Sequence, residues 1–493
     1  MPFQRSTSAL AMIAALAGAP LATSAQTSPP PPASASTRAD LDAWIARQMT
    51  LRSIPGMQVV VVKDGRVVFS GAYGVANLQT PVPVTPDTIF SINSATKTFT
   101  GVEIMRLVER GKVDLDAPVS TYLPNLPQAW RPITVRQLLT HMSGLPDIVT
   151  HDGYVGQDRA SAVAALADLP LRSTPGERFA YNQTNYMLLQ WIVEQAHGRD
   201  FEAVVGEDAF AAFGMAHSGF GDSLDLVPGK ADSYRYGRPV FGGAPRLQNV
   251  HELFPSFARA AAGVNSTGLD LAHWLIALQG GHILRTETLN ALWSPGRFND
   301  GKPGEWANGW VVVDRPEHRS VGMNGGGRSA FSVYPNDGVA VIVLTNLAGA
   351  YPEELTDPVA ARFIPGLRLT GVTALREWLE AEGFERADGV AAELIARDGP
   401  AALPENQLNN WGYRLLTGGK TAEALTVMQL IVRLYPESGN AYDSLAEAYD
   451  RAGDRSGAVE NYRRSLVLDP ANANAVEQLA RLQSDNADTA PVR

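Results

Sequence analysis

Two clusters of apolar, β-branched runs stand far apart in the 493-residue chain, and they constrain the fold more than any other feature. The first cluster is Gln58 to Val62 and Val67 to Ala72, around Lys63-Asp64-Gly65-Arg66. An Asp-Gly pair between two such runs is a hairpin signal. The second cluster comprises Trp310 to Val313, Ala330 to Tyr334 and Val339 to Thr345, with a turn at Pro335-Asn336-Asp337-Gly338.

Most of the chain between the two clusters has the pattern of helices or loops, for example Thr98 to Arg110 and Tyr186 to Ala196. This order predicts an α/β (α+β) domain, in which an antiparallel sheet is made from the two ends of the domain and flanked by helices. The long insertion between the clusters predicts a helical subdomain as well.

The N-terminus has the order of features that an export signal needs. Arg5 supplies a positive start, Ala9 to Leu21 is an apolar run too short to span a bilayer, and Thr23-Ser24-Ala25 ends in small residues. We therefore expect a signal peptide over residues 1–25, no integral membrane segment after cleavage, and a periplasmic or secreted protein. Residues 26–38 are rich in Pro, Ser and Thr and predict a disordered linker.

The C-terminal part contains an internal repeat. Residues 408–436 align with residues 442–470 at a period of 34, with Gly at the turn, Ala at the helix crossing and Pro at the end. This pattern resembles tetratricopeptide repeats. It predicts an all-α, tetratricopeptide-like module over residues 405–485, which docks on the rest of the chain or on a protein partner. We expect a domain over residues 39–365, a helical linker over 366–404 and a disordered tail over 486–493.

Charge and composition exclude several kinds of chemistry. The net charge is −10 and no basic block is present, which argues against a nucleic-acid partner. The chain has no cysteine, so thiolate nucleophiles and cysteine-bound zinc are excluded. The eight histidines are scattered without metal-ligand spacing, and we expect neither a metal nor a cofactor.

One of only six lysines stands three residues after a serine, in Ser94-Ala95-Thr96-Lys97. Residues i and i+3 share a helix face, so the amine of Lys97 can reach the hydroxyl of Ser94. A neutral lysine can take the proton that keeps serine a poor nucleophile, whereas arginine cannot because it stays protonated. Taken alone, the pair favours the simpler interpretation of an N-cap serine followed by a solvated lysine in the first turn.

The surrounding segments stand in a characteristic order. They are Thr85-Pro86-Asp87-Thr88-Ile89-Phe90, Ser94-Ala95-Thr96-Lys97, Leu107-Val108-Glu109-Arg110-Gly111-Lys112 and Leu138-Leu139-Thr140-His141-Met142-Ser143-Gly144-Leu145-Pro146. This order resembles the superfamily of class C β-lactamases, D,D-carboxypeptidases and esterases over about residues 40–365. The resemblance implies a β-lactamase/transpeptidase-like fold, with Ser94 as nucleophile and Lys97 as its base. We expect a structural role for His141.

The family's second motif, Tyr-x-Asn, corresponds to Tyr181-Asn182-Gln183. The resemblance makes Tyr181 the phenol that shares proton transfer with the lysine. Gln183 stands where the family has asparagine, so we expect the substrate contact to move.

The third motif, Lys/His-x-Gly, corresponds to Asn324-Gly325-Gly326 when it is counted back from Phe331-Ser332. The family's cation is thus replaced by Asn324, which argues against a typical β-lactamase; Arg328 nearby is an alternative source of charge. Gly326 and Gly327 fit a close approach of backbone to ligand. By analogy, the amides of Ser94 and of about residue 327 form the oxyanion hole.

These residues predict a serine hydrolase that forms an acyl-enzyme from an ester or amide. The substrate is a small molecule or short peptide: an ester, a D-amino-acid derivative or a peptide, with weak β-lactam recognition also compatible. The alternative is a catalytically degenerate fold that acts as an interaction protein through its repeats.

Overall fold

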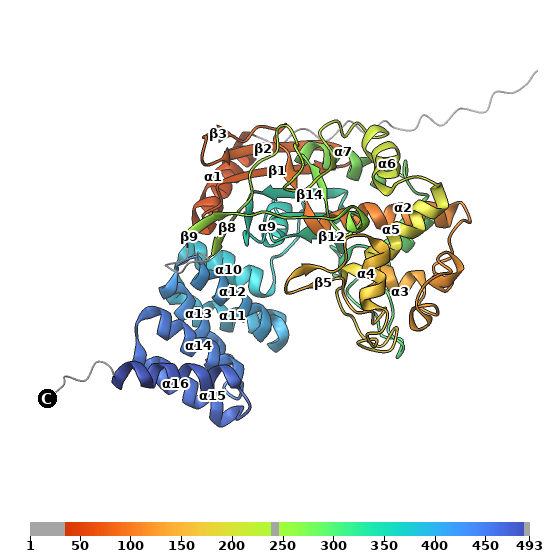
Figure 1. Ribbon diagram of the computed structural model, residues 1–493. Coiled ribbons are helices and arrows are strands. Elements are labelled where there is room, and N and C mark those ends of the chain that lie inside the picture. Colours follow the sequence, from red (N-terminus) through yellow and green to blue (C-terminus); the bar gives the residue numbers. More distant parts are fainter. Residues whose placement is uncertain (1–34, 238–245, 488–493) are drawn as a thin grey trace, which may run out of the picture.

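The structure, a computed structural model, describes residues 35–237 and 246–487. The predicted signal peptide, most of the predicted linker and residues 488–493 of the predicted tail lie outside these ranges. Within them, no helix combines the length and apolar character needed to cross a membrane. The described chain forms a sheet domain with a helical lobe, followed by a helical module (Figure 1).

A seven-stranded antiparallel sheet is the centre of the first domain, in the order β11-β12-β13-β14-β1-β2-β3. Its strands are β1 (Gly56–Lys63), β2 (Arg66–Asn77), β3 (Val82–Pro83), β11 (Val311–Val313), β12 (Ser320–Gly325), β13 (Ser329–Tyr334) and β14 (Val339–Thr345). Strand β1 pairs with β14, and Val60 lies opposite Ile342. The predicted sheet from the two ends of the domain is therefore confirmed.

Both faces of the sheet are covered, which explains why its central strands are apolar throughout. Val59 and Val61 pack with α1 (Ala35–Arg52) and α9 (Glu353–Ala360). Val60 and Val62 belong to the larger core on the other face, which includes α2, α5 and α7. Successive side chains of a strand point to opposite faces, so a run of valines supplies two cores at once.

The helical lobe holds most of the chain between β3 and β11. Its helices are α2 (Lys97–Glu109), α3 (Val135–Leu139), α4 (Arg159–Leu166), α5 (Gln183–His197), α6 (Phe201–Val205), α7 (Gly268–Gln279) and α8 (Thr286–Leu292). Short strands connect them: β4 (Phe90–Ser91), β5 (Val149–Thr150), β6 (Gly153–Tyr154), β7 (Gly219–Phe220), β8 (Tyr234–Gly237), β9 (Arg246–Asn249), β10 (Val264–Ser266) and, after the main sheet, β15 (Leu347–Ala348). Tryptophans 130, 274 and 310 are fully buried in this lobe.

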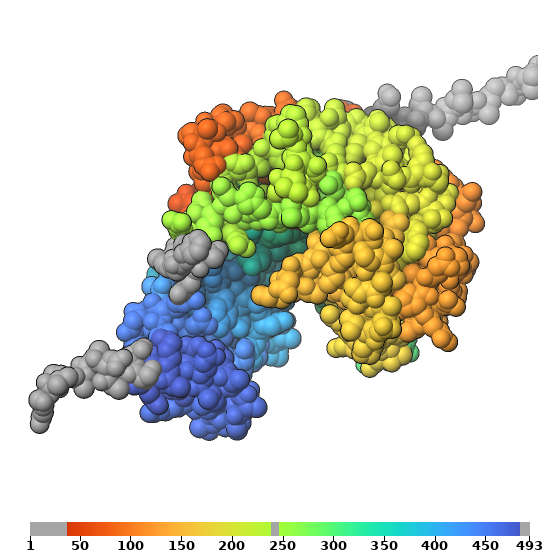
Figure 2. Space-filling model, in the orientation of Figure 1, coloured from red at the N-terminus to blue at the C-terminus, as the bar shows by residue number. Residues whose placement is uncertain are grey.

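The C-terminal module consists of α10 (Gly371–Glu382), α11 (Ala387–Asp398), α12 (Glu405–Thr417), α13 (Thr421–Leu434), α14 (Gly439–Ala452), α15 (Arg455–Leu468) and α16 (Ala473–Ala487). Helices α12, α14 and α16 begin 34 residues apart, as do α13 and α15, which is the period read from the sequence. Helices α10 and α11, in the expected linker, share one hydrophobic core with α12 to α14. The module (blue) and the lobe that carries β5 and α4 (gold) stand on either side of a hollow (Figure 2).

Strand β12 was not among the strands expected from apolar runs. Its sequence, Ser-Val-Gly-Met-Asn-Gly, lacks the β-branched density of its neighbours. Tertiary pairing with β11 and β13 makes it a strand in spite of this composition.

Asn346 ties the end of β14 to the strands beside it, and its removal tests how much this junction stabilises the sheet. Its buried amide accepts from the N–H of Gly56 at 2.8 Å and donates to the carbonyl of Val75 at 3.0 Å. Asn346→Ala leaves both partners unsatisfied, so we expect it to lower the free energy of unfolding by about 2–3 kcal/mol in urea titrations. Asn290→Ala, on an exposed position of α8, is the matched control and should not destabilise. Equal effects of the two substitutions would contradict the assignment.

Candidate active site

Ser94 lies on a tight turn between a short strand and a long helix. The chain leaves β4, passes through a 3₁₀ turn over Asn93–Thr96 and enters α2 at Lys97. Asn93 adopts a left-handed conformation, with φ of +48°, which reverses the chain just before the serine. Ser94 is partly exposed, whereas Lys97 is fully buried.

Three oxygens surround the amine of Lys97. Its Nζ lies 3.5 Å from Ser94 Oγ, 2.8 Å from Gln183 Oε1 and 2.8 Å from the carbonyl oxygen of Ala261. Burial lowers the pKa of Lys97, while Tyr181 and Asp147 act in the opposite direction. A lysine with a lowered pKa, next to a partly exposed serine hydroxyl, is the arrangement that general-base activation requires.

Tyr181 lies beside this pair. Lys97 Nζ is 4.8 Å from the centre of the Tyr181 ring, and the phenol side chain is 38% exposed. The ring packs on His141, with centroids 4.4 Å apart, and on Trp306 at 5.6 Å. The three residues predicted as catalytic are therefore brought together, although they come from separate parts of the chain.

His141 supports Tyr181 from behind. Its Nδ1 accepts from the backbone N–H of Asn182 at 3.2 Å and lies 3.1 Å from Asn185 Nδ2. Complete burial, and secondarily the charge of Lys97, hold the pKa of His141 well below its ordinary value. A neutral, fully buried imidazole that receives two amide donors acts as a structural support, in agreement with the expectation.

Gln183 begins helix α5 and turns toward Lys97. Asn182 caps this helix, because its side chain accepts from the N–H of Asn185 at 3.1 Å and donates to the carbonyl of Leu145 at 2.6 Å. The N–H of Gln183 donates to Asp147 Oδ1 at 2.9 Å. The additional methylene of glutamine thus does not remove its amide from the site.

The turn after β12 closes against the nucleophile. A Cβ atom on Gly325 would lie 1.9 Å from the carbonyl oxygen of Ile92 and 2.8 Å from the amide nitrogen of Ser94, so only glycine fits here. Gly326, with φ of +58°, lies against the side chain of Asn93. Gly327 faces Gly349 and Tyr351, on the far side of the turn. Asn324, in the last part of β12, is partly exposed.

Arg328 is engaged in an ion pair beneath the site. It is 2% exposed, and its guanidinium donates to both oxygens of Glu252 at 2.9 and 3.0 Å. Glu252 also accepts from Asn93 Nδ2 at 2.9 Å. The positive charge of Arg328 is therefore already balanced, and its role is to hold the residue that precedes Ser94 rather than to replace the family's missing cation.

Sequence reasoning missed three participants: Asp147, Glu252 and the carbonyl of Ala261. Asp147 directly follows the marker segment that ends at Pro146, which is the one signal that could have indicated it. Glu252 lies in a connecting segment without a motif, and any residue type supplies a backbone carbonyl, so neither had a sequence signal.

Within the described ranges, one cluster of side chains that could in principle bind a metal lies farther along α2. Glu103, His197 and Asp208 have ligand atoms within 4.8 Å of one another. Arg106 Nη1 lies 3.2 Å from both Glu103 Oε1 and Asp208 Oδ2. Because a guanidinium already balances these carboxylates, the cluster does not fit a metal centre.

Known proteins resemble this chain in sequence. The model of the family described as Beta-lactamase matches residues 41–364. Protein flp of Staphylococcus aureus (strain MRSA252) is 24% identical over 359 residues, covering 68% of each chain. Penicillin-binding protein 4* of Bacillus subtilis (strain 168) is 26% identical over 291 residues, covering 56% of this chain and 63% of the relative.

Solved structures give the same result. The octameric penicillin-binding protein homologue from Pyrococcus abyssi has a TM-score of 0.55 and 27% identity, over 66% of this chain and 76% of its own. The D-amino acid amidase from Ochrobactrum anthropi SV3 has a TM-score of 0.53 and 25% identity, over 66% of this chain and 95% of its own. The matched range includes Ser94 and Lys97, and the chain belongs to the Beta-lactamase family.

Proposed function

We propose that this protein hydrolyses a small ester or amide through an acyl-enzyme on Ser94. The observation that carries the proposal is the buried Lys97 amine, 3.5 Å from a partly exposed serine hydroxyl. Its relatives support hydrolase chemistry in general, since they include a protein named as a D-amino acid amidase and proteins named as penicillin-binding.

In the first step, Ser94 Oγ attacks the carbonyl carbon of the substrate while its proton passes to the neutral amine of Lys97. Tyr181 carries the proton on to the leaving alcohol or amine as the carbon–heteroatom bond breaks. In the second step, water attacks the acyl-enzyme along the same proton route, and the acid and free Ser94 are released. Gln183 keeps the amine in place through its 2.8 Å hydrogen bond.

The negative charge that develops on the carbonyl oxygen needs donors on the opposite side. We assign this role to the amide of Ser94 and an amide of the Gly325–Gly327 turn. The close approach of Gly325 to the nitrogen of Ser94 supports the assignment. Such donors contribute about 3 kcal/mol each to stabilisation of the transition state.

We propose esters, D-amino-acid amides and short peptides as the substrate class, ahead of β-lactams. The position that the family fills with a cation is Asn324 here, and the nearby Arg328 is paired with Glu252. A carboxylate on the substrate, such as that of a β-lactam, therefore lacks the cation that the family has at this position. A panel of p-nitrophenyl esters, D-alanyl peptides and nitrocefin tests this order; nitrocefin as the best substrate would overturn it. The N-terminal sequence supports a location in the periplasm or outside the cell.

Replacing the nucleophile tests the proposal directly. We expect Ser94→Ala to lower the hydrolysis of an activated p-nitrophenyl ester by more than about 10³-fold and to abolish labelling by a fluorophosphonate. Ser294→Ala, at an exposed position, is the matched control and should retain full activity. Undiminished turnover by Ser94→Ala would exclude the assignment. If neither a fluorophosphonate nor labelled penicillin modifies Ser94 in the native protein, the binding-protein alternative is favoured.

The pH profile tests the role of Lys97. Because burial lowers its pKa, the amine becomes neutral below the ordinary lysine value of 10.5, and kcat/KM should rise with pH along a limb whose midpoint lies below 10.5. The charged and polar side chains that face the amine are Tyr181, Tyr186, His141, Asp147 and Gln183.

Lys97→Arg keeps the positive charge but cannot lose its proton, so we expect a loss of about 10²–10⁴-fold and no basic limb. Stopped-flow measurement of acylation between about pH 5 and pH 11 checks both statements. A wild-type limb centred above 10.5, or one that persists in Lys97→Arg, would rule out Lys97 as the base.

A further inference from the structure

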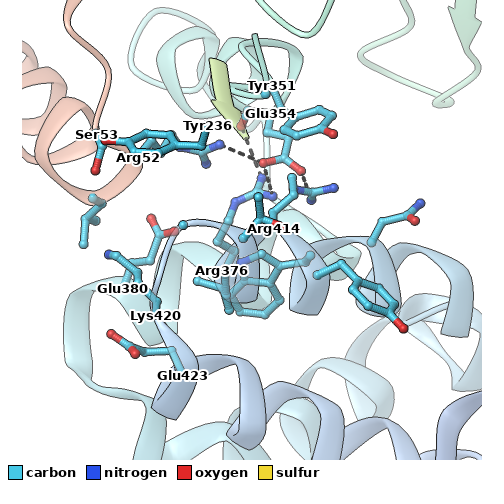
Figure 3. Close-up of a pocket in the computed structure, with 18 of the residues that line it drawn as sticks. Arg52, Ser53, Tyr236, Tyr351, Glu354, Arg376, Glu380, Arg414, Lys420 and Glu423 are labelled. Carbon is cyan, nitrogen blue, oxygen red and sulfur yellow. Dashed lines mark hydrogen bonds and ion pairs between the residues drawn. The ribbon is translucent and has the colours of Figure 1, made fainter. Parts of the chain in front are cut away.

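The joint between the sheet domain and the C-terminal module is built around one carboxylate. Glu354 of α9 accepts hydrogen bonds from Arg52 Nη1 at 2.9 Å and from Arg414, and its carboxylate forms an ion pair with Arg376 Nη1 at 2.7 Å (Figure 3). Burial by itself would raise the pKa of this carboxyl, but the three guanidinium groups hold it at about 2. Arg376 and Arg414 belong to α10 and α12, so the cluster fastens the module to the domain.

Arg414 also contacts Tyr351, four residues beyond the start of β15. The guanidinium carbon lies 4.6 Å from the centre of the Tyr351 ring. Tyr351 has a φ of +51°, a left-handed conformation that residues with a side chain rarely adopt. Such a conformation persists only where the surroundings hold it, and here the ring is held by a side chain of the module.

The backbone of Tyr351 reaches the turn behind the nucleophile. Its N–H donates to the carbonyl oxygen of Gly327 at 3.0 Å, and the N–H of Gly349 donates to the same oxygen at 3.1 Å. Arg52 fixes the intervening segment by donating to the carbonyl of Ala350 at 3.1 Å. Two residues before Gly327, Gly325 lies against the amide of Ser94. A continuous series of contacts thus leads from the module to the nucleophile.

Arg414 lies next to open space at the joint between the sheet domain and the C-terminal module. A cavity of about 590 Å³ lies beside it, lined in part by Arg52, Tyr351, Arg376 and Arg414 (Figure 3). The side chain of Arg414 remains 21% exposed, whereas that of Arg376 is 2% exposed. Arg414 is therefore the contact that can open without disrupting a core.

We propose that Arg414 and Tyr351 are positioning residues of the serine site, through which the C-terminal module holds the Gly325–Gly327 turn in register with Ser94. This inference rests on the proposed acyl transfer at Ser94. It assigns the module a part in catalysis within its own chain, in addition to any partner that it binds.

The test compares Arg414→Ala with Arg433→Ala in the full-length protein. Arg433 is the matched control because it pairs with Asp388 inside the module, away from the joint. The acylation rate constant for a p-nitrophenyl ester is measured per active site, titrated by the burst of p-nitrophenol. We expect Arg414→Ala to lower it about tenfold, with little change in substrate affinity, and Arg433→Ala to leave it unchanged. Equal rates per titrated site in the two variants would overturn the proposal.

Three further variants separate positioning from folding. Tyr351→Gly removes the ring that Arg414 contacts, and glycine tolerates the positive φ at this position. We therefore expect it to lower the acylation rate constant about as much as Arg414→Ala does. The double variant should lose no more than either single one, because both act through one series of contacts. Arg414→Lys keeps the charge without the planar stack and should show an intermediate rate. Additive losses would mean that the two residues act independently, contrary to the proposal.

Hydrogen exchange distinguishes failure of this inference from failure of the proposed function. In Arg414→Ala, the amides of Gly349 and Tyr351 should exchange faster, whether or not Ser94 is the nucleophile. If these amides exchange faster but turnover does not depend on Ser94, the proposed function is wrong. The contact between Arg414 and Tyr351 would then have no role in catalysis. Unchanged exchange together with an active wild-type enzyme would overturn only the inference.

Discussion

The close backbone contact between Gly325 and the turn that carries Ser94 is the constraint on which the site depends. A side chain at position 325 would overlap the carbonyl of Ile92, so the last residue of β12 has to be glycine. The contact joins the end of β12, in the main sheet, to the turn that leads into α2. Lys97 is the first residue of that helix, and Tyr181 and Gln183 contact its amine from the segment that enters α5.

The site also shows how polar groups are buried at a tolerable free-energy cost. Lys97 has three oxygens within reach, Arg328 has Glu252, and His141 has two amide donors. These contacts hold the reacting pair in place, although Arg328 Nε and His141 Nε2 are buried without a hydrogen-bond partner in the described part of the chain. The two positions that differ from the family motifs are Gln183, which accepts a hydrogen bond from Lys97, and Asn324, which is partly exposed.

Much of this could be predicted from the sequence because the signals were local. Valine runs and an Asp-Gly turn predicted β1, β2, β13 and β14, and the 34-residue period predicted the spacing of the module's helices. The predicted residues Ser94, Lys97 and Tyr181 do lie together. Strand β12, by contrast, is made by pairing rather than by propensity, and Glu252 and the Ala261 carbonyl enter the site only through tertiary contacts. The joint at Glu354 joins residues from four helices, and no single segment of sequence contains its pattern.

The pairing of β1 with β14 has a consequence for how the chain is made. Val60 cannot meet Ile342 until nearly the whole first domain has left the ribosome, so the central sheet closes late and over a long loop. Until then, the early hairpin has an open edge that is apolar on both faces and prone to association with other chains. The central sheet is therefore completed only after synthesis has passed β14, and the early hairpin has to remain unpaired on that edge until then.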